Sequence, residues 1–145
     1  MPQLDKHEAS VSLEAHLYSR IDTPFAWGVH DCCLFAADAI EAMHGVDIAD
    51  DFRGKYSDQV SAMELIKTVT GGSTIADAAA HCASKHGMTE HQFPLMAQRG
   101  DLVVMKNGDN VIAGVVHLNG RHIVSISEQG PVRLSILSVI RAWHF

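Results

Sequence analysis

The sequence predicts one α+β domain in which helices precede an antiparallel sheet. Two observations lead to this class. Before residue 86, apolar residues recur at three- and four-residue steps in four segments, as on one face of an amphipathic helix. From residue 100 onward, short runs rich in β-branched residues alternate with turn signals. Helices and strands segregated in this way along a chain are typical of helix-on-sheet layers.

Local stop and start signals give the first two helices. The first is expected over residues 8–19. It is expected to end before Pro24, because proline biases the preceding residue away from the helical region. The second is expected at about 31–44. Asp31 is a good N-cap residue, since its carboxylate can accept from backbone N–H groups of the first turn, and Gly45 suits a left-handed stop.

Two further helices follow an acidic and then mixed segment, 46–56, that is expected to be a loop. The third helix is expected over 58–69 and is ended by Gly71-Gly72. Thr74 can cap the fourth, which runs to about Lys85.

The second half of the chain is expected to form a meander of strands. The predicted strands lie at 100–106, 111–118, 121–126 and 132–136. Asn119-Gly120 is a strong signal for a two-residue hairpin turn, because both residues tolerate positive φ. The tail 138–145 ends in aromatic residues that are expected to dock on the body of the domain.

Composition restricts the class of protein. A chain of 145 residues with 47% hydrophobic and 19% charged residues suits a single globular domain, 1–145. The net charge of −6 gives no support to a nucleic-acid partner. No run of eighteen apolar residues indicates a membrane span, and the polar N-terminus lacks the layout of a signal peptide. We therefore expect synthesis in the cytoplasm.

Cysteine and histidine usage predicts neither disulfides nor a metal or cofactor. The three cysteines are an odd number and two of them are adjacent, which suits a reducing compartment. The ten histidines form no HExxH motif, and no paired CxxC is present. His81 and Cys82 are neighbours on an expected helix and point about 100° apart, so they do not converge on one ion.

Cys32 is the candidate nucleophile. It stands at the first position of the second helix, where the positive end of the dipole favours thiolate over thiol. The alternative is a cysteine buried as a small hydrophobe, and position alone does not separate the two. For Cys82, which lies among alanines, the core interpretation is favoured.

Several motifs resemble those of one family of peptidases. They are Trp27-Gly28-Val29-His30-Asp31-Cys32, Phe35-Ala36-Ala37-Asp38, Gly45-Val46-Asp47, Arg53-Gly54-Lys55-Tyr56, Arg99-Gly100-Asp101-Leu102-Val103-Val104, Ala113-Gly114-Val115-Val116 and Arg141-Ala142-Trp143. Together they resemble the NlpC-type cell-wall cysteine peptidases, which are papain-like, and within them a phage and prophage tail-associated branch. The resemblance implies a papain-like NlpC-type fold, with the N-terminal helices packed on the C-terminal antiparallel sheet.

The resemblance also implies a site. Cys32 matches the catalytic cysteine, and its thiolate would attack a peptide carbonyl of the cell wall while backbone N–H groups at the helix start hold the oxyanion. In active members a histidine opens the second strand, in a His-Val-Gly-Ile-type run. On this chain Ile112 stands at that position, and isoleucine can neither accept nor donate a proton.

Other histidines are weaker candidates for the base. His117 lies five residues beyond Ile112, about 16 Å along the strand at ~3.3 Å per residue, and an odd step points it to the opposite face. His122 pairs with His117 across the expected turn and shares its face. His30, two residues before Cys32, is a further candidate, with the alternative that it only shapes the loop.

Two main hypotheses follow, with a cytosolic thiol amidase unrelated to phage as a distant third. In the first, the chain is a structural component of a phage tail tip or hub with a degenerate cysteine-peptidase site. In the second, it is an active peptidoglycan endopeptidase with Cys32 as nucleophile. Both imply other tail proteins as partners, a peptidoglycan peptide as the ligand of an active site, and a virion tail as destination. The C-terminal aromatics and the acidic loop 47–51 are candidate partner surfaces.

Overall fold

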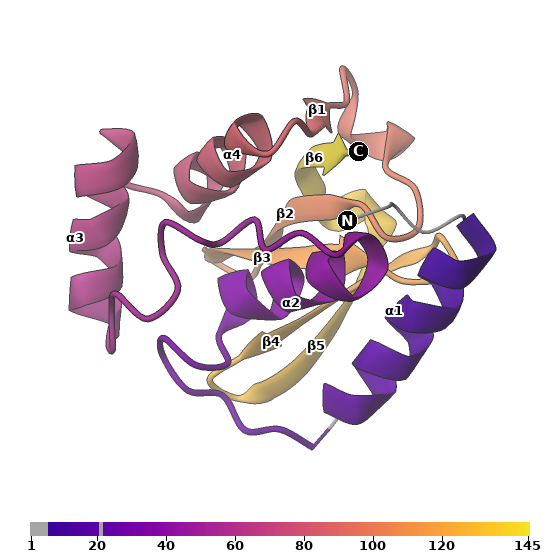
Figure 1. Cartoon of the computed structure of the whole chain (residues 1–145), viewed down its shortest axis with the longest axis horizontal. Coiled ribbons are helices and arrows are strands. Elements are labelled where there is room, and N and C mark those ends of the chain that lie inside the picture. The colour runs from indigo at the N-terminus through magenta and orange to yellow at the C-terminus, as the bar shows by residue number, and fades with distance from the viewer. Residues whose placement is uncertain (1–5, 21) are drawn as a thin grey trace.

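The computed structural model describes residues 6–20 and 22–145, and it confirms the α+β class (Figure 1). The helices of the described residues are α1 (Lys6–Arg20), α2 (Cys32–His44), α3 (Gln59–Thr70) and α4 (Ile75–Lys85). The strands are β1 (Thr89–Glu90), β2 (Leu102–Asn107), β3 (Asn110–Val116), β4 (His122–Ser127), β5 (Gly130–Ser135) and β6 (Val139–His144). Two short 3₁₀ turns, η1 (Pro94–Met96) and η2 (Ile136–Ser138), complete the elements.

Side-chain caps explain why the helices begin where they do. Asp31 accepts from the backbone amide of the third residue of α2. Asp58 and Thr74 form capping boxes at the starts of α3 and α4, in which the residue at the third helical position bonds back to the cap. At the other end of α2, Gly45 has φ of 73°, the left-handed conformation that glycine adopts without strain.

The sheet has the strand order β1-β6-β2-β3-β4-β5 and is antiparallel at every pairing. The predicted meander corresponds to β2 through β5. The tail is a strand of the sheet, where the sequence predicted only a docked segment. β6 pairs with β2 on one side and with β1 on the other, which buries Trp143. Because both partners lie far away in the sequence, no local signal indicated this pairing.

The turn between β3 and β4 is longer than the expected two-residue hairpin. Its register, Val115↔Val124 and Val116↔Ile123, is centred on Asn119-Gly120 as predicted, but the described strands stop at Val116 and resume at His122. The Asn119 side-chain oxygen accepts from the amides of Arg121 at 2.8 Å and His122 at 3.1 Å. The Gly120 amide donates to the His117 carbonyl at 2.9 Å and the His117 amide to the His122 carbonyl at 2.8 Å, so a hydrogen-bonded turn over residues 117–120 closes the longer loop.

Helix α2 is the central element of the fold. It packs against α1 on one side and against β3 and β4 on the other, and its apolar residues are buried along most of its length (Figure 1). α4 covers β2 and β3 beside it, and α3 lies against α4. The two ends of α2 therefore open onto different regions of the molecule.

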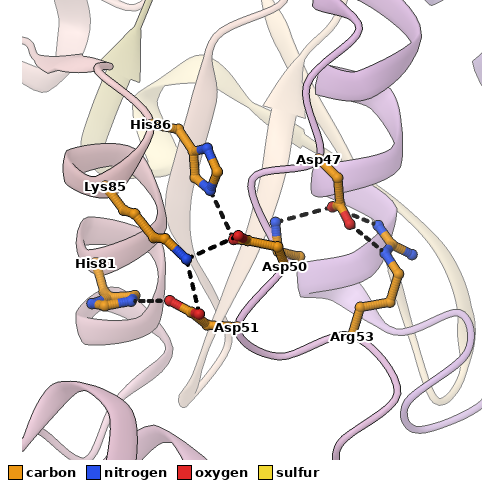
Figure 2. A network of polar contacts seen from close by, with 8 residues as sticks. Asp47, Asp50, Asp51, Arg53, His81, Lys85 and His86 are labelled. Carbon is orange, nitrogen blue, oxygen red and sulfur yellow. Dashed lines mark hydrogen bonds and ion pairs between the residues drawn. The ribbon is translucent and has the colours of Figure 1, made fainter.

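A polar network ties the loop after α2 to α4 (Figure 2). The Lys85 ammonium lies 2.8 Å from an Asp50 oxygen and 2.9 Å from an Asp51 oxygen. His86 and His81 contact the same two carboxylates at 2.8 Å each. Lys85 and His86 together lower the pKa of Asp50 to about 2. These acidic side chains of the candidate partner surface 47–51 are thus already paired within the chain.

A buried histidine, His30, and a half-buried one, His16, lie close together near the contact of α1 with α2. The rings of His16 and His30 both pack against Phe35, with centroids 6.4 and 5.9 Å away. The Nε2 atoms of both are buried and have no hydrogen-bond partner among the described residues. Burial is the main cause that lowers the pKa of each imidazole; the charge of Arg20 acts in the same direction and that of Asp38 against it.

We expect this pair to make the fold acid-sensitive. Below about pH 6.5 the unfolded chain takes up protons at His16 and His30 before the folded chain does, so stability present above that pH is lost as pH falls. Each histidine contributes a slope of at most about 1.4 kcal/mol per pH unit. Urea unfolding of wild type and His30→Gln across this range measures the effect. His30→Gln should flatten the dependence, whereas His122→Gln, in the turn after β3, should not; equal slopes in all three proteins would contradict the explanation.

Candidate functional site

Cys32 lies at the start of α2 with its thiol against the sheet. The residue is 8% exposed. Besides the α2 N-terminus, the backbone amide of Ala113 in β3 hydrogen bonds to the sulfur and favours the thiolate. The helix end and a strand amide therefore converge on one sulfur atom, an arrangement that can stabilise negative charge there.

Asp31 holds this arrangement together and is itself almost fully buried, at 1% exposure. One carboxylate oxygen accepts from the Leu34 amide at 2.9 Å. The other accepts from the Gly28 amide at 3.0 Å and from the Tyr56 hydroxyl at 2.5 Å. Burial and the charge of Asp31 raise the pKa of Tyr56, which keeps its proton on the phenol. The carboxylate is thus a cap that joins three segments.

Gly28 is required by the same turn. Its φ is 78°, and a Cβ built at this position would clash with the backbone carbonyl oxygen of Tyr56. The close approach lets the segment before α2 and the segment before α3 share Asp31. Any side chain at position 28 would push them apart.

Cys33 modifies the acidity of its neighbour. The two sulfur atoms are 4.0 Å apart. The hydrogen bond from Cys33 lowers the pKa of the Cys32 thiol, while burial and the charge of Asp31 act in the opposite direction. The same hydrogen bond and burial raise the pKa of Cys33. Of the pair, Cys32 is therefore the thiol that ionises first.

A small apolar cavity of about 50 Å³ adjoins both thiols. Side chains from three helices, the loops between them and the sheet line it, including Trp27, Ile48, Phe52, Tyr56, Ile66 and Cys82. Burial raises the pKa of Cys82 to about 12, so this third thiol stays protonated. The cavity is lined mainly by apolar side chains, and Asp31 is the one carboxylate among the described residues that line it.

None of the ten histidines lines this cavity. His30 is close in sequence, but its ring packs on Phe35 on the α1 side, and its backbone pairs with Ala26 to shape the turn. The remaining histidines lie in four other places. They are His16 beside His30; His81 and His86 on the acidic loop; His117 and His122 at the turn after β3; and His7, His44, His91 and His144 at the far end of α2.

The position on β3 closest to the thiol is Ala113. Ala113 lines the cavity beside Cys32, whereas Ile112 does not. Successive side chains on a strand point to opposite faces, so residues 112 and 113 cannot both face the helix. Neither alanine nor isoleucine can transfer a proton. Ile112 was expected at the position of the histidine of NlpC-type peptidases. It is one residue away from Ala113, the β3 residue that lines the cavity beside the sulfur.

A third close histidine–carboxylate pair, which the sequence did not indicate, is more buried than the two on the acidic loop. His91 Nε2 lies 2.7 Å from an Asp101 oxygen, and the two side chains are only 10% and 11% exposed. They meet near the C-terminal end of α2, where Asp101 precedes β2. Asp101 stands in the Arg99-Gly100-Asp101 motif, but nothing in the sequence spacing indicated His91 as its partner. Among the described residues, no three His, Cys, Asp or Glu side chains are grouped to hold a metal ion.

Residues 5–145 match a family model described as a domain of unknown function, DUF6950. The chain belongs to this family. No curated protein and no solved structure matches the DUF6950 chain. No described helix has both the length and the apolar character needed to cross a bilayer.

Removing the Tyr56 hydroxyl should destabilise the DUF6950 fold. Tyr56→Phe deletes a hydrogen bond to a buried carboxylate, and we expect the free energy of unfolding to fall by about 2 kcal/mol. Urea denaturation measures the change. Tyr18→Phe is the matched control, because Tyr18 is 80% exposed and should lose nothing. Equal stability of the two variants would show that the Asp31 bond contributes little.

The Cys32–Cys33 contact predicts a change in thiol reactivity. Cys33→Ala removes the hydrogen bond to the Cys32 sulfur, so the pKa of Cys32 should rise and its alkylation by iodoacetamide near neutral pH should slow several-fold. Mass spectrometry of the Cys32 peptide follows the reaction as a function of pH. Cys82→Ala serves as control and should leave the Cys32 profile in place. A profile that shifts in neither variant would contradict this role for Cys33.

Proposed function

We propose that this chain is an NlpC-like protein associated with a phage tail, built into the tail tip or hub, with a cysteine-peptidase site that has lost its base. The proposal takes the family from the sequence motifs around Cys32. An α2 cysteine packed against an antiparallel sheet is consistent with the papain-like layout that those motifs imply. Synthesis in a host cytoplasm followed by assembly into a virion accounts for a chain with unpaired cysteines.

The observation that carries the proposal is the composition of the Cys32 surroundings. All ten histidines lie away from the cavity that adjoins the thiol, and Ala113 occupies the strand position beside the sulfur. A general base contributes about a hundredfold or more to such a reaction. The helix dipole alone contributes about 0.3–1 kcal/mol, which is less than a tenfold change in ionisation. Loss of the general base therefore lowers the expected rate by more than the helix dipole at Cys32 can raise it.

Asp31 does not replace that base. Both of its oxygens already accept hydrogen bonds from the Gly28 and Leu34 amides and the Tyr56 hydroxyl. Its charge opposes ionisation of Cys32, since it raises the pKa of the thiol. A carboxylate that caps the helix in this way supports a structural role for the site.

One observation favours the second candidate, an active peptidoglycan endopeptidase. The pKa of Cys32 is lowered by the Cys33 thiol and the Ala113 amide in spite of burial. A thiolate formed there would be positioned to attack a carbonyl whose oxygen meets the amides at the start of α2. The adjoining cavity would then hold a small apolar side chain of the substrate.

Muropeptide digestion separates the two candidates. We expect purified wild-type protein and Cys32→Ala to release no cleaved muropeptides from peptidoglycan, as judged by liquid chromatography and mass spectrometry. Cleavage by wild type that disappears in Cys32→Ala would overturn the structural proposal and support the peptidase. Tyr18→Phe, an exposed change, controls for loss of activity through handling.

The tail assignment has its own test. We expect mass spectrometry of purified particles, released from a host that carries the gene, to detect this chain in the tail fraction. Particles assembled with Cys32→Ala should infect as well as wild type, because the proposal gives the thiol no catalytic step. Absence of the chain from particles would overturn the assignment.

A further inference from the structure

A second site lies at the end of α2 opposite Cys32, about 18 Å along the helix at 1.5 Å per residue. It is an open cleft of about 930 Å³ between α1, the end of α2, the segment leading to β2, and the end of β6. Six titratable or charged side chains of the described residues line it: His7, His44, His91, Arg99, Asp101 and His144.

The His91–Asp101 pair fixes one imidazole of this cleft. Asp101 accepts from the Gln98 amide at 2.9 Å and lies 2.7 Å from His91 Nε2. An ionised carboxylate only accepts hydrogen bonds, so His91 donates from Nε2 and its other ring nitrogen, Nδ1, carries the lone pair. No described residue hydrogen bonds to that nitrogen. Protonation at Nδ1 would add a donor to the cleft without disturbing the bond to Asp101.

His144 supplies a similar group next to it. Its Nδ1 lies 2.9 Å from the main-chain oxygen of Phe145, and because that oxygen accepts, Nδ1 is the donor. The lone pair of His144 therefore resides on Nε2. The rings of His91 and His144 lie with their centroids 4.5 Å apart, and both residues line the same cleft.

The cleft lacks the acidic excess of the whole chain, since the charges of Arg99 and Asp101 balance when the histidines are neutral. The chain carries a formal charge of −6, yet Asp101 is the one carboxylate side chain among the described lining residues, and it is already paired. Arg99 is a permanent cation with a planar set of donors that matches phosphate and carboxylate oxygens. An imidazole that takes up a proton becomes a cation with two N–H donors.

We propose that this cleft binds a small oxyanion, a phosphate or carboxylate group, through Arg99 and the protonated rings of His91 and His144. Binding strengthens with falling pH, since each proton taken up at an imidazole adds both a positive charge and a hydrogen-bond donor. The site is separate from Cys32 and depends on neither candidate function.

Sulfate is the first probe, because its charge stays constant between about pH 6 and pH 8, so a change in its binding over that range reports on the protein. Amide chemical shifts in ¹⁵N-labelled protein are followed at constant ionic strength, with sodium chloride replaced by sulfate. We expect saturable shifts at lining residues such as Gly100 and Leu118, with affinity about tenfold higher at the lower pH, or about 1.4 kcal/mol. Inorganic phosphate and acetate titrated at the lower pH then show which oxyanion is preferred.

Variants decide whether the cleft is responsible. Arg99→Gln should weaken sulfate binding about tenfold, and His91→Gln should reduce its pH dependence, because His144 remains. Arg133→Gln on β5 is the matched control and should bind like wild type. Cys32→Ala should also bind normally, which keeps this result independent of the peptidase question. Absence of saturable shifts at the lower pH, or equal binding by wild type and Arg99→Gln, would overturn the proposal.

Discussion

The buried carboxylate of Asp31 is the interaction on which the rest of the structure depends. It accepts hydrogen bonds from the turn before α2, from the first turn of α2 and from the segment before α3. One side chain therefore fixes the first turn of α2 relative to the two irregular segments that precede α2 and α3. Because α2 then packs on β3 and β4, the same carboxylate sets where Cys32 meets the sheet.

The cap that positions Cys32 also limits its chemistry. A negative charge next to the thiol favours the protonated form, while the Cys33 thiol, the Ala113 amide and the helix start favour the thiolate. An active cysteine hydrolase resolves this competition with an imidazole that takes the proton. In this chain the imidazoles lie at the α1 interface, on the acidic loop, at the turn after β3 and at the far end of α2, away from the Cys32 cavity.

The parts of the fold that the sequence predicted are those whose signals are local. Asp31, Gly45 and Thr74 each act within four residues, and they place the helix ends closely. For the site, the same logic found Cys32 and its cap. Tyr56 and Ala113 stood in motifs, but the sequence could not place them beside Asp31 and Cys32, because tertiary packing brings them there. The pairing of β6 and the His91–Asp101 contact were not predicted for the same reason. Their partners are brought together by the folded sheet and not by spacing along the chain.

The position of β6 has a consequence for how the domain forms. This strand follows every other strand in the sequence, yet it lies inside the sheet, between β1 and β2. Until it has been synthesised, β2 is an edge with unpaired backbone groups and apolar side chains such as Val103 and Val104. The edge of β2 therefore stays without its second neighbour from the time β2 is made until residues 139–144 follow. Formation of the complete sheet waits for this last strand, whose contacts with β1 and β2 are both distant in the sequence.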